Sequence, residues 1–168
     1  VKPALLFEVE AQEYAIALTY TEAVVALPKA AVHRVNGRLL ARHQERTLSL
    51  IFLRDLFGMR SMEGINAPNA LLQHFDRMGE AEQLPVILVR YHNRTLGLVV
   101  DKLLQQKEIV EKKRRPPIHN IDLFSGATVL GTGNVCLVLD IVQLFVHLFK
   151  DKRRQWNPSS TSFNGSTT

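Results

Sequence analysis

"SGATVLGTGNVCLVLD", residues 125–140, contains two glycines five positions apart, Gly126 and Gly131, with Thr132 directly after the second. This is the glycine spacing of phosphate-binding loops, so a nucleotide site is the first hypothesis. Such a loop, however, needs a lysine after its second glycine and then a helix whose N-terminus faces the phosphates. Here a threonine stands in that place, and "NVCLVLD" is typical of a strand. The stretch therefore predicts a hairpin, in which Gly131 and Gly133 take positive φ angles at the turn and Gly126 lets the chain enter the first strand.

Alternation of apolar and polar residues predicts a mainly β fold along the rest of the chain. Residues 5–18 and 85–100 each predict a hairpin of half-buried strands, and residues 47–53 predict a further strand. Asp101 and Asp140 each follow an apolar run, and we interpret both as caps that accept backbone N–H bonds, before "KLLQQ" and the last helix respectively. The three helices that the pattern predicts are short: Leu53–Phe57, Asn69–Met78 and Ile141–Phe149.

The composition limits the classes of protein to which the chain can belong. Its 168 residues, 46% of them hydrophobic, are enough for one domain or for two small lobes that share a core. No apolar run approaches the roughly twenty residues of a membrane span, and no signal peptide opens the sequence. The single cysteine, Cys136, has no partner for a disulfide, which fits a reducing cytoplasm. The net charge of +5 comes largely from basic runs at 111–117 and 150–154, which we interpret as solvated charge.

An internal repeat indicates how the strands are organised. The hairpin around Tyr14 aligns with the hairpin around Leu96, and residues 47–57 align with residues 135–145. Each half of the chain therefore runs hairpin, crossover, hairpin and short helix in the same order. We expect two similar small β-barrels packed together, because one open sheet of this size would leave its edges exposed.

Four segments together resemble the CheW-like domain family. They are "LFEVEAQEYAIAL" (6–18), "VNGRLLARHQERTLSLIFLRDLFG" (35–58), "LGLVVDKLLQQKEIVEK" (96–112) and "FSGATVLGTGNVCLVLDIVQLF" (124–145). The family includes the free chemotaxis coupling protein CheW and the C-terminal regulatory domain of the histidine kinase CheA. The run "GLVVDKLLQQKEIV" followed by "SGATVLG" is closer to the kinase-attached version, which we prefer over the free coupling protein.

The resemblance implies a fold and a function. The fold is a pair of SH3-like five-stranded β-barrel subdomains, intertwined within residues 1–149 and followed by a polar tail or linker at residues 150–168. The function is that of a non-catalytic scaffold at receptor arrays on the inner, cytoplasmic face of the membrane. Its implied partners are a CheW-type coupling protein, the cytoplasmic tip of a chemoreceptor and a kinase domain in the same polypeptide, with no nucleic acid and no membrane insertion. A receiver-like domain after residue 168 would indicate a hybrid kinase.

Protein-binding residues are expected in turns at the barrel ends, where a partner barrel can dock. The candidates are Asn36, Gly37, Arg38, Arg42, Glu45, Arg46, Val129, Leu130, Gly131, Thr132, Gly133 and Asn134. The family's usual Arg-Gly and proline are missing from "RHQERTLSL" (42–50), where Ser49 stands at the proline position, so contacts carried by that loop are open to question.

Other chemistry finds little support in the sequence. The six histidines have no metal-ligand spacing, His43 and Glu45 lack a nucleophile motif, and no catalytic residue, cofactor or metal is expected. Two alternatives from other classes stay open. One is a nucleic-acid-binding double barrel, motivated by the basic charge, and the other is a nucleotide-hydrolysing enzyme.

Overall fold

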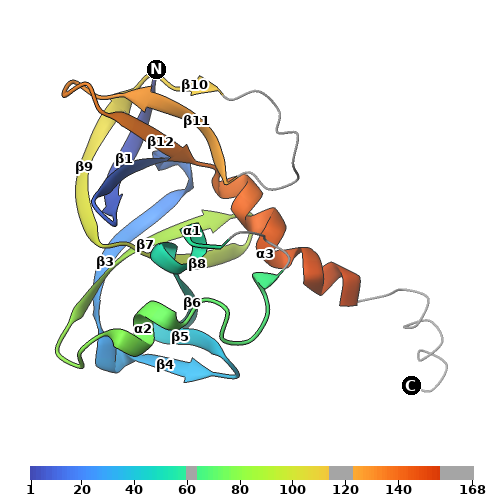
Figure 1. The fold of residues 1–168 in the computed structure, drawn as a ribbon. Helices are drawn as coiled ribbons and strands as arrows, with labels where there is room; N and C mark the ends of the chain where they lie inside the picture. The colour runs from blue at the N-terminus through green and yellow to red at the C-terminus, as the bar shows by residue number, and fades with distance from the viewer. Residues whose placement is uncertain (60–63, 114–122, 156–168) are drawn as a thin grey trace.

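The computed structural model of the chain describes residues 1–59, 64–113 and 123–155 (Figure 1). Within these residues the fold is mainly β, with two six-stranded sheets and a few helices, as the sequence predicts. The upper sheet of Figure 1 has the order β10-β11-β12-β2-β1-β9, from β1 (Lys2–Val9), β2 (Gln12–Ala17), β9 (Lys102–Ile109), β10 (Lys112–Lys113), β11 (Phe124–Val129) and β12 (Val135–Leu139).

The lower sheet is formed by one continuous part of the chain inserted between β2 and β9 (Figure 1). Its order is β3-β7-β8-β6-β5-β4, from β3 (Thr21–Pro28), β4 (Val32–Val35), β5 (Arg38–His43), β6 (Arg46–Phe52), β7 (Gln83–Tyr91) and β8 (Arg94–Val99). The helical segments are η1 (Leu18–Tyr20), η2 (Lys29–Ala31), α1 (Leu53–Phe57), α2 (Gln73–Arg77) and α3 (Ile141–Gln155).

Both edges of each sheet come from the same stretch of chain. β9 and β10 are separated only by Val110 and Glu111, and β3 and β4 only by η2, yet the members of each pair lie at opposite ends of the strand order. One bent segment therefore supplies both edges, which is the strand pattern of a five-stranded barrel with one strand bent in two. Each sheet therefore has six strands, where the prediction had five strands per barrel.

Each barrel combines one hairpin from each half of the chain. In the upper barrel β2 runs parallel to β12, with Tyr14 opposite Leu137. In the lower barrel β8 runs parallel to β6, with Leu96 opposite Ser49. The repeat aligns Tyr14 with Leu96 and Leu137 with Ser49, so the two barrels have the same register at this junction.

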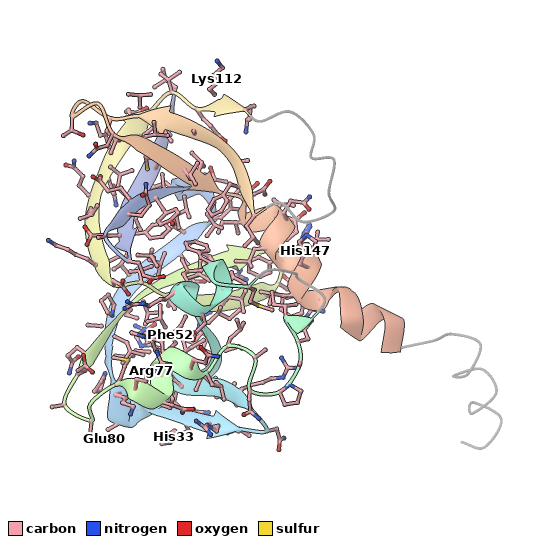
Figure 2. The ribbon with its side chains drawn as sticks, viewed as in Figure 1. His33, Phe52, Arg77, Glu80, Lys112 and His147 are labelled. Atoms are coloured by element: carbon pink, nitrogen blue, oxygen red, sulfur yellow. The ribbon has the colours of Figure 1, made fainter. Side chains whose placement is uncertain are left out.

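A shared hydrophobic core joins the barrels. Phe7 of the upper barrel, Ile87 of the lower barrel and Leu144 of α3 are fully buried in one cluster. Figure 2 shows side chains of both sheets filling the space between them. Because each barrel also has its own smaller internal cluster, central strands such as β1 and β8 are buried on both faces.

Two of the three predicted helices differ in length from the prediction. α1 has the predicted bounds, whereas α2 begins at Gln73, because Asn69 has a φ of 70° and donates its N–H to the carbonyl of Gly37. α3 continues six residues beyond Phe149, so the first part of the predicted tail is helical. Residues 156–168 of that tail lie outside the described residues.

The two aspartates interpreted as caps have different roles. Asp140 does cap α3, since its Oδ1 accepts the N–H of Gln143 at 3.1 Å. Asp101 accepts a backbone N–H as predicted, but it does not cap a helix, because "KLLQQ" lies within strand β9. Its carboxylate instead accepts the N–H of Glu10 at 2.6 Å, and this bond ties the end of the lower barrel to the β1–β2 turn.

Candidate protein-interaction surfaces

The turn between β11 and β12 is a tight, exposed loop at one end of the upper barrel. Leu130 donates its N–H to the carbonyl of Asn134 at 2.9 Å, and Gly133 donates to the carbonyl of Leu130 at 2.8 Å. Gly133 has a φ of 89°, as predicted, but Gly131 does not have a positive φ, so that part of the prediction is wrong. The hydroxyl of Thr132 accepts the N–H of Asn134 at 3.4 Å, which further restrains the loop.

Three exposed valines surround this turn. Val110 is 68% exposed, Val129 69% and Val135 52%, whereas the neighbouring Leu130 is buried in the barrel. Val110 and Val129 line the same shallow hollow between β9 and β11. We call Val110, Val129, Val135 and residues 131–134 the β11–β12 surface. Exposed apolar side chains gathered beside a restrained turn are typical of a docking site rather than of a solvated face.

Glu111 holds the bend between β9 and β10 that carries Val110. Its carboxylate is only 3% exposed, accepts a hydrogen bond from the Ser125 hydroxyl at 2.6 Å and forms ion pairs with Lys2 and with Lys113, the latter at 3.3 Å. Burial alone would raise the pKa of Glu111, but the hydrogen bonds and the charge of Lys2 outweigh burial and lower it. This side chain therefore fastens the bend between β9 and β10 to β1 and β11.

Gly126 lets β10 lie close against β11. A Cβ at this position would collide with the carbonyl oxygen of Lys112 and lie 2.7 Å from a carboxylate oxygen of Glu111. Its role is thus to let β10 approach β11, which pairs Lys113 with Gly126, and not simply to admit the chain to a strand.

The candidates in the lower barrel fall at two separate turns. Asn36 and Gly37 form the β4–β5 turn, with φ angles of 53° and 75°, and Gln44 and Glu45 form the β5–β6 turn, with φ angles of 49° and 65°. The turns lie at opposite ends of the six-residue strand β5, roughly 17 Å apart at 3.4 Å per residue. They do not form one continuous surface.

Several of these candidates are engaged within the chain. A Cβ on Gly37 would lie 2.7 Å from the side chain of Pro68, so Gly37 is covered by another segment. Arg38 donates to the carbonyl of Asn66 at 2.7 Å, and Arg46 is paired with Glu22. Asn36, Arg42 and Glu45 are exposed side chains.

The residues that complete the β11–β12 surface could not be recognised in the sequence. Val110 and Val135 carry no motif of their own, because a valine beside a strand is usually buried. Glu111 stood in a basic run that we interpreted as solvated, and its neighbours Lys112 and Lys113 are indeed exposed. Only the fold shows that β9 and β11 lie on either side of one hollow.

A family comparison identifies the fold. The sequence model of the CheW-like domain matches residues 3–149, nearly the whole described chain. The chain belongs to the CheW-like domain family. The sensor histidine kinase CheAY of Helicobacter pylori is 27% identical over 138 residues, which are 82% of this chain and 15% of the kinase. The chemotaxis protein CheA of Bacillus subtilis is 24% identical over 142 residues, 84% of this chain and 19% of that protein.

A solved structure has the same fold. The crystal structure of the scaffolding protein TtCheW from Thermoanaerobacter tengcongensis superposes with a TM-score of 0.56 and 15% identity, covering 83% of this chain and 89% of that one. This CheW-like domain spans less than a fifth of the length of the two relatives named above.

Four features of the described part of this CheW-like domain concern the other function classes. Its exposed large hydrophobic residues are all valines, whereas sequence-tolerant nucleic-acid binding uses exposed aromatic rings for base stacking. Residues 1–59, 64–113 and 123–155 contain no group of three or more potential metal ligands. No helix among them is long and apolar enough to span a bilayer. The glycines of residues 125–140 belong to strand β11 and a hairpin turn, so the phosphate-loop hypothesis is not supported.

Proposed function

We propose that this CheW-like domain is a non-catalytic coupling scaffold of a chemotaxis-type signalling system. The observation that carries the proposal is the β11–β12 surface, where exposed Val110, Val129 and Val135 surround a restrained turn at one barrel end. A second CheW-like domain with an apolar barrel end is the occupant that this surface fits. Burial of exposed aliphatic side chains would supply the binding free energy, and the surrounding polar groups would set the orientation.

The proposal requires a second docking region at the opposite end of the molecule. Figure 2 places Lys112 at the far end of the upper barrel and His33 at the far end of the lower barrel. A scaffold with surfaces at two ends can join two neighbours, and repeated joining builds chains or closed rings. On this proposal the neighbours are a CheW-type coupling protein and a histidine kinase, and the assembly contacts the cytoplasmic tip of a chemoreceptor.

A titration with a CheW-type coupling protein of the same genome tests the proposal. We expect Val129→Glu and Val110→Glu each to weaken the Kd at least tenfold, since each would place a charge in the apolar contact. Val24→Glu is the matched control, because Val24 is 43% exposed on β3, away from the β11–β12 surface. Absence of binding at high micromolar concentration, or equal weakening by all three variants, would contradict the proposal.

The kinase-attached version of the domain remains our prediction from the sequence, with the free coupling protein as its alternative. Immunoblotting of native cells with an antibody against this domain distinguishes the two. A band several times larger than the isolated domain indicates attachment to a kinase, and a band of the domain's own size indicates a free coupling protein.

A further inference from the structure

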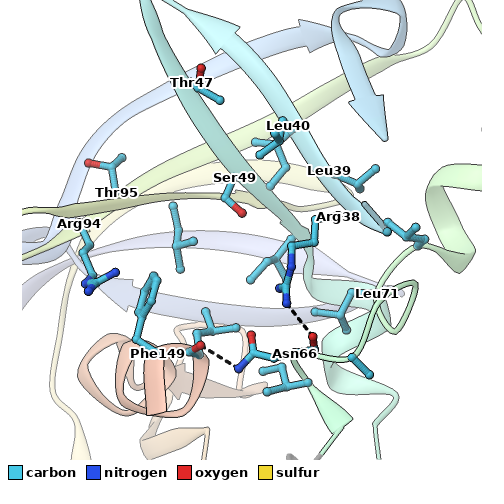
Figure 3. A pocket seen from close by; sticks show the side chains of 18 residues that line it. Arg38, Leu39, Leu40, Thr47, Ser49, Asn66, Leu71, Arg94, Thr95 and Phe149 are labelled. Carbon is cyan, nitrogen blue, oxygen red and sulfur yellow. Dashed lines mark hydrogen bonds between the residues drawn. The ribbon is translucent and has the colours of Figure 1, made fainter. Parts of the chain in front are cut away.

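A cleft of about 360 Å³ lies on the lower barrel, away from the β11–β12 surface (Figure 3). Its floor is formed by apolar side chains of β5, β6 and β8, including Leu40, Ile51 and Leu96. One wall is the segment 64–72 and another is the middle of α3, where Leu148 and Phe149 line the cleft. This volume lies within the roughly 300–1,000 Å³ that is usual for small-molecule sites.

Hydrogen bonds between distant segments hold the walls in place. Arg38 donates to the carbonyl of Asn66 at 2.7 Å, and the Asn66 side chain donates to the carbonyl of Leu148 at 2.8 Å (Figure 3). The N–H of Asn69 also bonds the carbonyl of Gly37 at 2.9 Å. These bonds connect β5, the segment 64–72 and α3, so the cleft is pre-formed.

The charge of the cleft is positive among the residues that the structure describes. Of these residues, Arg38 and Arg94 line the cleft, and no aspartate or glutamate does. Neither arginine forms an ion pair within the described part of the chain. Four other arginines do: Arg34 with Asp76, Arg46 and Arg90 with Glu22, and Arg54 with Glu10 and Asp101.

The arrangement of the polar groups resembles the recognition of an anion. The Arg94 guanidinium stacks 4.1 Å from the centroid of the Phe149 ring, which fixes its plane and leaves its edge N–H groups available. Arg38 bonds Asn66 through one terminal nitrogen and retains further donors. Thr47 and Thr95 also line the cleft.

We propose that this cleft binds a small organic anion with an apolar body, such as a medium-chain carboxylate. The anionic group would lie between the arginines at the mouth, where charge-assisted hydrogen bonds are available, and the apolar body would lie over Leu40, Ile51 and Leu96. The site is independent of the proposed coupling function, because it shares no residue with the β11–β12 surface.

The test uses octanoate as the probe and compares it with octanol and octylamine, which have the same chain length. Binding to the purified chain is followed by nuclear magnetic resonance titration. We expect saturable octanoate binding with shift changes at Leu40, Ile65 and Leu96, and at least tenfold weaker binding of the neutral and cationic probes. Arg94→Gln and Arg38→Gln should each weaken octanoate binding about tenfold.

Arg77→Gln is the matched control, since Arg77 is exposed on α2 and does not line the cleft. It should leave the octanoate Kd unchanged. Circular dichroism of each variant checks that the fold is retained. Arg94→Gln removes a charge from the cleft but leaves in place the Arg38–Asn66 hydrogen bond, which holds the wall of the cleft. Equal binding of octanoate and octanol, no saturable octanoate binding at millimolar concentration, or an unchanged Kd in Arg94→Gln would each overturn the proposal.

Discussion

Replacement of Glu111 should destabilise the upper barrel more than replacement of an exposed glutamate in the same region. The Glu111 carboxylate is 3% exposed and is held by Lys2, Lys113 and Ser125. A hydrogen bond to a charged group contributes about 1.5–3 kcal/mol, and loss of one member of a buried ion pair costs about 3–5 kcal/mol. Because Lys2 is 35% exposed, we place the cost of Glu111→Gln near the lower limit, at about 2–3 kcal/mol.

Urea unfolding at neutral pH measures this cost directly. In a chain of 168 residues, a loss of about 2–3 kcal/mol corresponds to a decrease in Tm of roughly 5–10 °C. Glu108→Gln is the control, because Glu108 lies on β9 three positions earlier and is exposed. It should change the free energy of unfolding by no more than about 0.5 kcal/mol.

The difference between the wild-type chain and Glu111→Gln should also depend on pH. The pKa of Glu111 is lowered in the folded state from its ordinary value of 4.5, so the folded protein holds the proton less tightly than the unfolded chain. The stabilisation is therefore complete above pH 4.5 and is lost as the pH falls through the lowered folded-state pKa. Equal stability of Glu111→Gln and Glu108→Gln, or a difference that stays constant down to pH 3, would refute the reasoning.

Three further predictions concern the core and one helix end. Asp140→Ala should cost about 1 kcal/mol in urea unfolding, because Asp140 caps α3, whereas Asp140→Asn should cost clearly less. Gly97→Ala should cost about 1–3 kcal/mol, because a Cβ there would collide with Leu50 and lie 2.9 Å from Val86; the control Gly64→Ala, with open space at its Cβ, should show a much smaller loss. Cys136, fully buried and with its pKa raised to about 11 by burial and by Glu13, should react with a thiol reagent at neutral pH only when urea unfolds the chain; rapid labelling of the native protein would contradict its burial.

The strands were predictable because their burial is local and periodic. β1 and β8 carry near-continuous apolar runs, and the β4–β5 turn is a two-residue loop whose positive φ angles favour Asn and Gly, as at Asn36 and Gly37. The repeat predicted that Tyr14 and Leu96 are equivalent, and the parallel pairs of both barrels confirm it. Sequence alone is sufficient where the pattern is short-range.

The errors lie where tertiary pairing outweighs local preference. Residues Lys102–Ile109 have adjacent leucines and no clear alternation, yet they form β9 because β1 pairs with them over most of their length. Asp101 follows a strand as an N-cap residue would, but the N–H that its carboxylate accepts belongs to Glu10, in a turn ninety-one positions earlier. Neither pairing leaves a trace in the local sequence.

The candidate site was predicted only in part for the same reason. The composition of residues 131–134 predicts a turn, and the structure places them in an exposed loop. Val110, however, belongs to the surface only because Glu111 fastens the β9–β10 bend beside β11. The second half of the surface is thus specified by a buried carboxylate and by Gly126, which contribute no apolar contact themselves.

The exchange of hairpins between the halves of the chain places both barrels around one shared core. The β1–β2 hairpin is completed by β11 and β12 from the far end of the sequence, and the helices that follow β6 and β12 both enter the shared core through fully or almost fully buried residues, Leu53 and Ile141. Neither barrel can therefore lose its hairpin pairing without disturbing the core that also supports the other. β11 pairs with β12, and α3 follows β12 and forms a wall of the arginine-lined cleft through Leu148 and Phe149. The upper barrel and the cleft on the lower barrel therefore share one helix as a structural element.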